Sequence, residues 1–251
     1  MNTEFSRMPP LRTLLSMDLK ARSALRERLD DHSLDDPHIG ATMRNLERIN
    51  VLLSGVRKIC KRAIFAAGRI DPAQPLTIAD LGCGGGDLAL WLARKCIKLR
   101  IDAHIIGIEH DPRVIALAKK RCNPEPSIAI IQGDATDLAN LPDPVDWIVS
   151  NHFLHHLDAV TVTRIMKTAS SRARRGMIMN DLVRSRRSLI EFNLLCRALM
   201  PAGHTAHDGI VSILRSFTAL ELSAFLTRAG LSSNAMITRS GIGHRAIIFR
   251  R

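Results

Sequence analysis

The sequence predicts an α/β fold built on a doubly wound, mostly parallel sheet of seven strands. Three observations support this prediction. A short apolar strand over residues 76–81 leads into a glycine-rich turn, an apolar pattern at helical spacing comes after that turn, and further short strands recur as far as residue 182. Strands that alternate with helices indicate a parallel sheet, because parallel neighbours need crossover connections. Two last apolar segments, 235–238 and 244–249, predict an antiparallel hairpin that completes the sheet.

The turn after the first strand is the most informative segment, and residues 80–87 read Asp-Leu-Gly-Cys-Gly-Gly-Gly-Asp. Glycine lets the backbone approach a ligand closely, and the first turn of the next helix offers free N–H groups. A dinucleotide-binding fingerprint needs its third glycine where Asp87 stands, so the pattern is Asp-x-Gly-x-Gly-x-Gly instead. Taken alone, these glycines fit equally a loop that only turns tightly.

Carboxylates come after the next two strands. The second strand, residues 104–109, ends in Glu109, about 25 residues beyond the glycines and close to where a nucleotide fold places its ribose-binding acid. Asp111-Pro112 then begins a helix, with proline in a tolerated first-turn position. The third strand, 128–131, leads into Asp134 and Ala135. The alternatives are a turn-capping role for Asp80 and solvated surface positions for Glu109 and Asp134.

The fourth and fifth strands complete the parallel part. Residues 145–151 run into the segment His-Phe-Leu-His-His-Leu at 152–157, and residues 176–182 form the fifth strand. We expect a helix after the fourth strand, in which His152 and His156, four residues apart, share a face while His155 points elsewhere.

These five segments, in this order, resemble the Rossmann-like (class I) S-adenosylmethionine-dependent methyltransferases over about residues 76–182. The resemblance implies that S-adenosylmethionine is the cofactor, that Asp80 orders the glycine loop, that Glu109 binds the ribose and that Asp134 holds the adenine amino group. The cofactor-binding residues that it implies are Asp80, Gly82, Gly84, Gly86, Glu109, His110, Asp134, Ala135 and Asn151.

The residues after the fourth strand narrow the substrate class. Methyltransferases that act on adenine or glutamine amino groups carry an Asn/Asp-Pro-Pro-Tyr type motif there, and residues 150–153 read Ser-Asn-His-Phe. Residues 151–157 instead resemble small-molecule methyltransferases, including the ubiquinone and menaquinone group. Residues 180–185 and 207–222 resemble bacterial methyltransferases found with type III polyketide synthases. The resemblance implies a small apolar or aromatic acceptor, phenolic or quinone-like, with O-methylation favoured over C-methylation.

Proton removal from such an acceptor points to histidine. A phenol has a pKa near 10, and histidine titrates closest to neutrality. The sequence therefore predicts His156 as the favoured base and His152 as the second candidate, with Asp181 and Asn151 at neighbouring strand ends as orienting partners. The alternative is that these imidazoles only cap or pad the predicted helix.

Two segments lie outside the core of the fold. We expect residues 1–70 to form an N-terminal helical extension, with helices over 12–29 and 43–67, and residues 71–251 to form the methyltransferase domain. A helical insertion is expected at about 187–216, interrupted by a polar link at 204–209. The extension and the insertion are predicted to enclose an apolar acceptor chamber.

Composition sets further expectations. The net charge is +12 and the pI about 10.4, but the charge is dispersed and aromatic residues make up only 4% with no tyrosine, so nucleic acid is disfavoured as a partner. Peripheral contact with an anionic membrane, a homodimer, an RNA methyltransferase that uses the basic surface, and a non-catalytic S-adenosylmethionine-binding protein remain open. The five cysteines are scattered without a C-x-x-C pair, which indicates a reduced, cytoplasmic protein without a bound metal.

Overall fold

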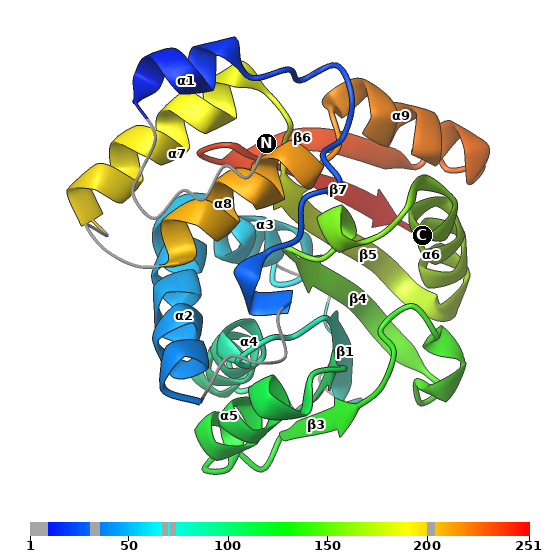
Figure 1. Ribbon diagram of the computed structural model, residues 1–251. Helices are drawn as coiled ribbons and strands as arrows, with labels where there is room; N and C mark the ends of the chain where they lie inside the picture. Colours follow the sequence, from blue (N-terminus) through cyan, green and yellow to red (C-terminus); the bar gives the residue numbers. More distant parts are fainter. Residues whose placement is uncertain (1–9, 31–35, 67–69, 71–73, 200–203) are drawn as a thin grey trace.

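A seven-stranded sheet forms the centre of the computed structural model, which describes residues 10–30, 36–66, 70, 74–199 and 204–251 (Figure 1). The strand order is β3-β2-β1-β4-β5-β7-β6, and within the described residues β7 alone runs antiparallel to its neighbours. This confirms the predicted fold class. The strands are β1 Leu76–Leu81, β2 Ala103–Glu109, β3 Ile128–Gln132, β4 Val145–Asn151, β5 Ala173–Leu182, β6 Ala235–Gly241 and β7 His244–Arg250.

Helices cover both faces of the sheet and one end of it. The α-helices are α1 Leu11–Ser16, α2 Asp36–Ile49, α3 Val56–Ala63, α4 Asp87–Lys98, α5 Pro112–Cys122, α6 Ala159–Arg172, α7 Arg186–Leu199, α8 His204–Arg215 and α9 Ala219–Arg228. Short helical turns are η1 Arg28–Asp30, η2 Asn50–Ser54, η3 Leu138–Asn140 and η4 Leu154–His156.

Two apolar clusters hold the layers together. On one face, α6 and α9 pack against the sheet through residues such as Ile165 and Phe225. On the other, α3 and α4 pack through residues such as Ile59 and Leu92. Helices on both faces of the sheet explain why β1 and β4 are buried along almost their whole length.

A third cluster joins the N-terminal extension to the insertion after β5. Leu14 of α1, Ile49 of α2, Leu189 of α7 and Ile213 of α8 are all buried within it. Figure 1 shows α1, α7 and α8 lying together beyond the carboxyl ends of the parallel strands. The two segments that the core fold does not need therefore pack on each other and cover that end of the sheet.

Two helix starts have the chemistry expected of them. The Asp111 side chain accepts a hydrogen bond from the backbone N–H of Arg113 at the start of α5, with Pro112 in the first turn. Thr218 and Glu221 form a reciprocal capping box at the start of α9.

The helix expected over residues 12–29 is wrong in most of its length, because α1 ends at Ser16. The next segment is non-helical up to η1 at Arg28, and arginine side chains join it to distant parts of the chain. Arg184 donates to the carbonyl of Leu19, and Arg22 donates to the carbonyl of Arg215. Tertiary contacts of this kind outweigh a weak helical pattern.

The single helix expected over 43–67 is also wrong, because it consists of α2, a π-helical turn and α3. Gly55 separates the last two with a left-handed φ of 68°, and a Cβ atom there would lie 2.0 Å from the carbonyl oxygen of Ser240. The last residue of that expected helix, at 67, lies outside the described residues. The polar link expected at 204–209 proves to be the first half of α8.

No helix among the described residues is by itself long and apolar enough to cross a membrane; α8 and α9 pass that test only as a pair, bent by 48°, on length and composition.

Candidate active site

A cavity of about 640 Å³ lies at the carboxyl ends of the parallel strands. The glycine turn, Glu109 and residues 134–136 line one side of the cavity, where the cofactor is expected to bind. Residues 151–157 line the opposite side. Residues of the N-terminal extension and of α8 line it, so the two segments border a cavity together as predicted, while its role as an acceptor chamber stays a prediction. Its walls are mixed rather than apolar, since Leu46, Leu157 and Phe192 share them with charged groups.

The glycine turn is ordered by Glu109. Gly82, Gly84 and Gly86 all have left-handed φ angles of 64°, 52° and 76°. The Glu109 carboxylate accepts the backbone N–H groups of Gly84 at 3.0 Å and of His110 at 2.8 Å. A Cβ atom at Gly84 would meet nothing within 4 Å, so space for a ligand lies directly against this backbone.

Asp80 lies beneath the turn at the end of β1. It is 1% exposed, and its Oδ2 atom has no hydrogen-bond partner among the described residues. Burial, with the nearby Asp87 and Glu109 carboxylates, raises the pKa of Asp80 well above its ordinary value. A cation placed in the cavity beside Asp80 would reverse that shift, so this group suits a positively charged ligand.

The remaining cofactor candidates lie around the same side. Asp134 is exposed and accepts hydrogen bonds from the backbone and side chain of Thr136, while Ala135 is buried. His110 is exposed, with Nδ1 3.0 Å from a Glu109 oxygen. All three candidates border the cavity.

Asn151, at the end of β4, belongs to a chain of amides. Its oxygen accepts from Asn180 at 2.7 Å, and its nitrogen donates to Asn50 at 2.9 Å. Asn50 in turn donates to the Asp87 carboxylate. Asn151 therefore ties β5, the π-helical turn and the start of α4 together beside the cavity.

The helix expected after β4 is wrong. His152 has a left-handed φ of 57° and precedes η4, which holds His155 and His156 in a 3-10 turn. The four-residue spacing of His152 and His156 consequently places them on no common helical face. All three histidines border the cavity, including His155, which was expected to point elsewhere.

Asp181 partners His155 instead of His156. Its two oxygens accept the backbone N–H of His155 at 2.9 Å and bond the ring Nδ1 at 2.7 Å. On the other side of the ring, Nε2 lies 3.4 Å from Glu27. Although burial opposes ionisation, the two carboxylates raise the pKa of His155 to about 10.

His152 and His156 are the neutral imidazoles of the cavity. Burial and the neighbouring His244 lower the pKa of His152 well below its ordinary value. Burial, and then the neighbouring His155, lower the pKa of His156 to about 4. His156 is the exposed member of the three, and its ring centroid lies 4.2 Å from that of His155.

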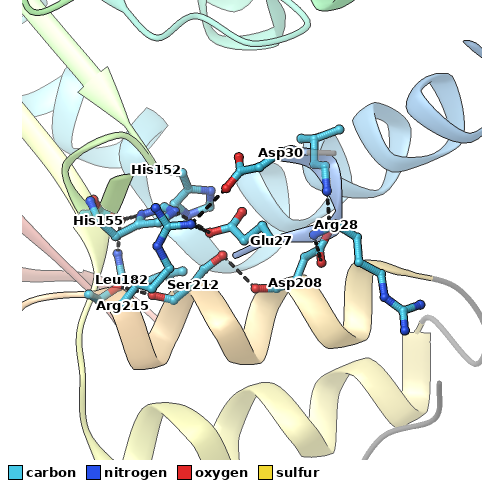
Figure 2. A network of polar contacts seen from close by, with 12 residues as sticks. Glu27, Arg28, Asp30, His152, His155, Leu182, Asp208, Ser212 and Arg215 are labelled. Carbon is cyan, nitrogen blue, oxygen red and sulfur yellow. Dashed lines mark hydrogen bonds and ion pairs between the residues drawn. The ribbon is translucent and has the colours of Figure 1, made fainter. Parts of the chain in front are cut away.

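A polar network joins the N-terminal extension to α8 at the histidine side of the cavity. Figure 2 shows Asp208, Ser212 and Arg215 projecting from α8 towards Glu27 and Asp30. Asp208 accepts the backbone N–H of Arg28 at 2.9 Å, and Arg215 bonds Asp30 at 3.0 Å. These contacts fix η1 over the cavity.

Comparison with known proteins relates part of the chain to a protein family. Residues 78–176, from β1 to the start of β5, match the family described as a methyltransferase domain. The segment 78–176 therefore has the sequence of a methyltransferase domain. The match confirms the resemblance to S-adenosylmethionine-dependent methyltransferases and, with it, the expected cofactor class.

Two curated relatives match the chain in part. The malonyl-[acyl-carrier protein] O-methyltransferase of Halalkalibacterium halodurans is 31% identical over 93 residues, which cover 36% of this chain and 33% of that protein. The 2-phytyl-1,4-naphtoquinone methyltransferase of Thermosynechococcus vestitus is 29% identical over 112 residues, covering 44% and 48%. The chain thus matches about a third and about half of the length of these relatives.

Solved structures extend the likeness to most of the chain at the level of fold. The plantazolicin methyltransferase in complex with S-adenosylhomocysteine gives a TM-score of 0.60 at 13% identity, over 88% of this chain and 91% of that one. Human N-acetylserotonin methyltransferase in complex with S-adenosylmethionine gives 0.55 at 18% identity, over 86% and 56%.

Sequence reasoning missed several groups around the methyltransferase cavity. Glu27, Arg215 and His244 come from the extension, from α8 and from the first position of β7. Arg215 and Asn180 lie within the segments 207–222 and 180–185 that carry the family resemblance, but that resemblance assigned no role to either residue. No role was predicted for Glu27, Asn50 or His244.

Proposed function

We propose that this chain is an S-adenosylmethionine-dependent methyltransferase that methylates an oxygen of a small phenolic or quinol acceptor. The observation that carries the proposal is the shared cavity. It joins the glycine turn and Glu109 on one side to three histidines on the other.

The residues present suit S-adenosylmethionine, which supplies a sulfonium methyl group when bound. The glycine turn offers free N–H groups and open space at Gly84. Glu109 suits the ribose hydroxyls and Asp134 the adenine amino group, as the family resemblance implies. The buried, unpartnered oxygen of Asp80 suits the positive charge of the methionine amino group.

The acceptor side suits a ring that carries a hydroxyl. Leu46, Leu157 and Phe192 offer apolar contact, and His152 and His156 border the same space. In methyl transfer, the methyl carbon–sulfur bond breaks as the carbon–oxygen bond forms, and the hydroxyl proton passes to an imidazole nitrogen. Alignment of the acceptor supplies much of the rate in such a displacement.

The naphthoquinone methyltransferase relative supports a quinone-like acceptor, and both curated relatives are methyltransferases of small or carrier-bound groups by name. Asp181 is reassigned in this proposal. It positions His155, and His155 fixes the turn that presents His156 to the cavity.

The test is turnover of S-adenosylmethionine against a panel of phenols and quinols, read as S-adenosylhomocysteine formed and as methylated product by mass. Product with a catechol, resorcinol or quinol supports the proposal. Cofactor binding without product from any acceptor would favour the non-catalytic alternative. Product only with RNA, with affinity that falls steeply as salt rises, would favour the nucleic-acid alternative.

A further inference from the structure

Three side chains with metal-ligating atoms meet at the histidine side of the cavity. Glu27, His155 and His156 each offer one ligand atom, and these atoms all lie within 4.8 Å of one another. Two imidazoles and one carboxylate are the ligand set of many catalytic zinc sites, which leave a fourth position open. Glu27 comes from the N-terminal extension and the histidines from η4, so the set forms only when the chain folds.

Glu27 supplies an unsatisfied oxygen to this cluster. The residue is 7% exposed, and among the described residues no hydrogen bond reaches its Oε1 atom. The Nε2 atom of His155 lies 3.4 Å from it and the Nη1 atom of Arg215 3.7 Å. A buried carboxylate oxygen without a hydrogen bond is costly, and coordination to a cation would offset that cost.

His155 is already held as a metal ligand would be. Its Nδ1 atom is bonded to Asp181 at 2.7 Å, and its backbone N–H donates to the other Asp181 oxygen. A carboxylate on one imidazole nitrogen fixes the ring and makes the other nitrogen a better ligand. Arg22 adds support, because it donates to the carbonyl oxygens of His155 and Leu157.

The Arg215 guanidinium is a positive charge that could neutralise Glu27 in place of a metal ion. Its contacts show which carboxylate it binds. Its Nη1 atom lies 3.0 Å from Asp30, closer than its distance to Glu27. Arg215 is thus hydrogen-bonded to Asp30, and it only forms an ion pair, without a hydrogen bond, with the Oε1 atom of Glu27. With Asp30 and Asp181 close by, the cluster stays rich in carboxylates.

We propose that Glu27, His155 and His156 bind a divalent transition-metal ion of the zinc type, with Asp181 as the positioning residue of His155. His156 is exposed and borders the cavity, so the ion would keep an open coordination position on the cavity side. Under the proposed function, that position takes the acceptor oxygen, and His152 then remains as the base. The scattered cysteines predicted no metal, but this cluster uses none of them.

Direct metal binding tests the proposal without cofactor or acceptor. The full chain, stripped with a chelator and dialysed, is titrated with Co²⁺ by visible absorption and with Zn²⁺ by calorimetry. We expect one ion per chain and a visible band typical of four- or five-coordinate Co²⁺. His156→Asn and Glu27→Gln are each expected to weaken binding about tenfold or more. His104→Asn, an exposed histidine on β2, is the matched control and should bind as wild type does.

The proposal is overturned if the wild-type protein binds neither Co²⁺ nor Zn²⁺. It is also overturned if His156→Asn and Glu27→Gln bind the ion as tightly as the His104→Asn control does. Circular dichroism checks that Glu27→Gln is folded; if it is not, the exposed His156 variant decides alone. Failure here is separate from failure of the proposed function. A chain that binds no metal can still produce S-adenosylhomocysteine, and a chain that binds metal can lack turnover.

Discussion

The Nε2 atoms of His152 and His244 lie 2.5 Å apart, which joins the end of β4 to the start of β7 across β5. The Nδ1 atom of His244 contacts the carbonyl of Ile242, so it must carry the proton. Nε2 of His244 is then an acceptor, and Nε2–H of His152 donates to it. The Nδ1 atom of His152, a residue that borders the cavity, then keeps its lone pair, as a base requires.

This pair predicts that the protein loses stability in mild acid. Burial lowers the pKa of His244 to about 4, while the unfolded chain binds a proton near the ordinary value of 6.5. The unfolded state therefore binds more protons as pH falls between these values, and the free energy of unfolding decreases through that window. His244 alone contributes on the order of 3 kcal/mol, which is fully present above about pH 6.5.

Denaturant unfolding at about pH 7, 5.5 and 4.5 measures this effect. His244→Asn should give a shallower pH dependence, and His104→Asn, which changes an exposed histidine, should behave as wild type does. If the free energy of unfolding changes equally with pH in all three proteins, His244 does not titrate as described.

Gly84→Ala is expected to weaken cofactor binding more than it weakens the fold. A Cβ atom at Gly84 meets nothing within 4 Å, yet it fills the space against the backbone where the ligand is proposed to lie. The stability cost should be about 1 kcal/mol, from the left-handed φ alone. Gly230→Ala is the matched control, because Gly230 has φ of 74° and an equally open Cβ position outside the cavity. Equal S-adenosylhomocysteine affinity in the two variants would be evidence against this placement.

Single turnover of His152→Ala, His155→Ala and His156→Ala on the best acceptor tests the histidine base. A positioned base contributes about 10²–10⁴-fold, so loss of the base should slow the chemical step by that factor. Raising the pH should restore part of the rate in a variant that lacks only the base. Rates within a few-fold of wild type in all three would show that positioning, without a histidine base, accounts for catalysis.

Thr218→Ala should lower stability by about 1 kcal/mol, because it removes the side chain that caps α9. Thermal or urea unfolding measures it. Thr227→Ala, within the same helix and exposed, is expected to change stability by less than half as much. A Thr218 variant as stable as wild type would mean that the capping box adds nothing.

The sheet and the cofactor side were predictable because their signals are local. Strand, glycine turn and carboxylate follow one another within residues 76–134, and short apolar runs between turn residues indicate buried strands. The histidine side was not predictable, because it depends on distant partners. Nothing near His155 in the sequence shows that Asp181 and Glu27 will bracket its ring, and nothing near Met17 shows that arginine side chains will replace helical hydrogen bonds. Cytoplasmic location, membrane contact and dimer formation stay predictions.

The central claim is that the cavity binds S-adenosylmethionine through Glu109, and calorimetric titration with S-adenosylhomocysteine tests it most directly. Wild type should bind one molecule per chain. Glu109→Ala should lose about 1.5–3 kcal/mol of binding free energy for each charge-assisted hydrogen bond removed, while Glu125→Ala, a carboxylate outside the cavity, should bind as wild type does. Thermal unfolding checks that Glu109→Ala remains folded, because Glu109 also holds the glycine turn. Unchanged affinity in a folded Glu109→Ala protein, or no binding by wild type, would contradict the account.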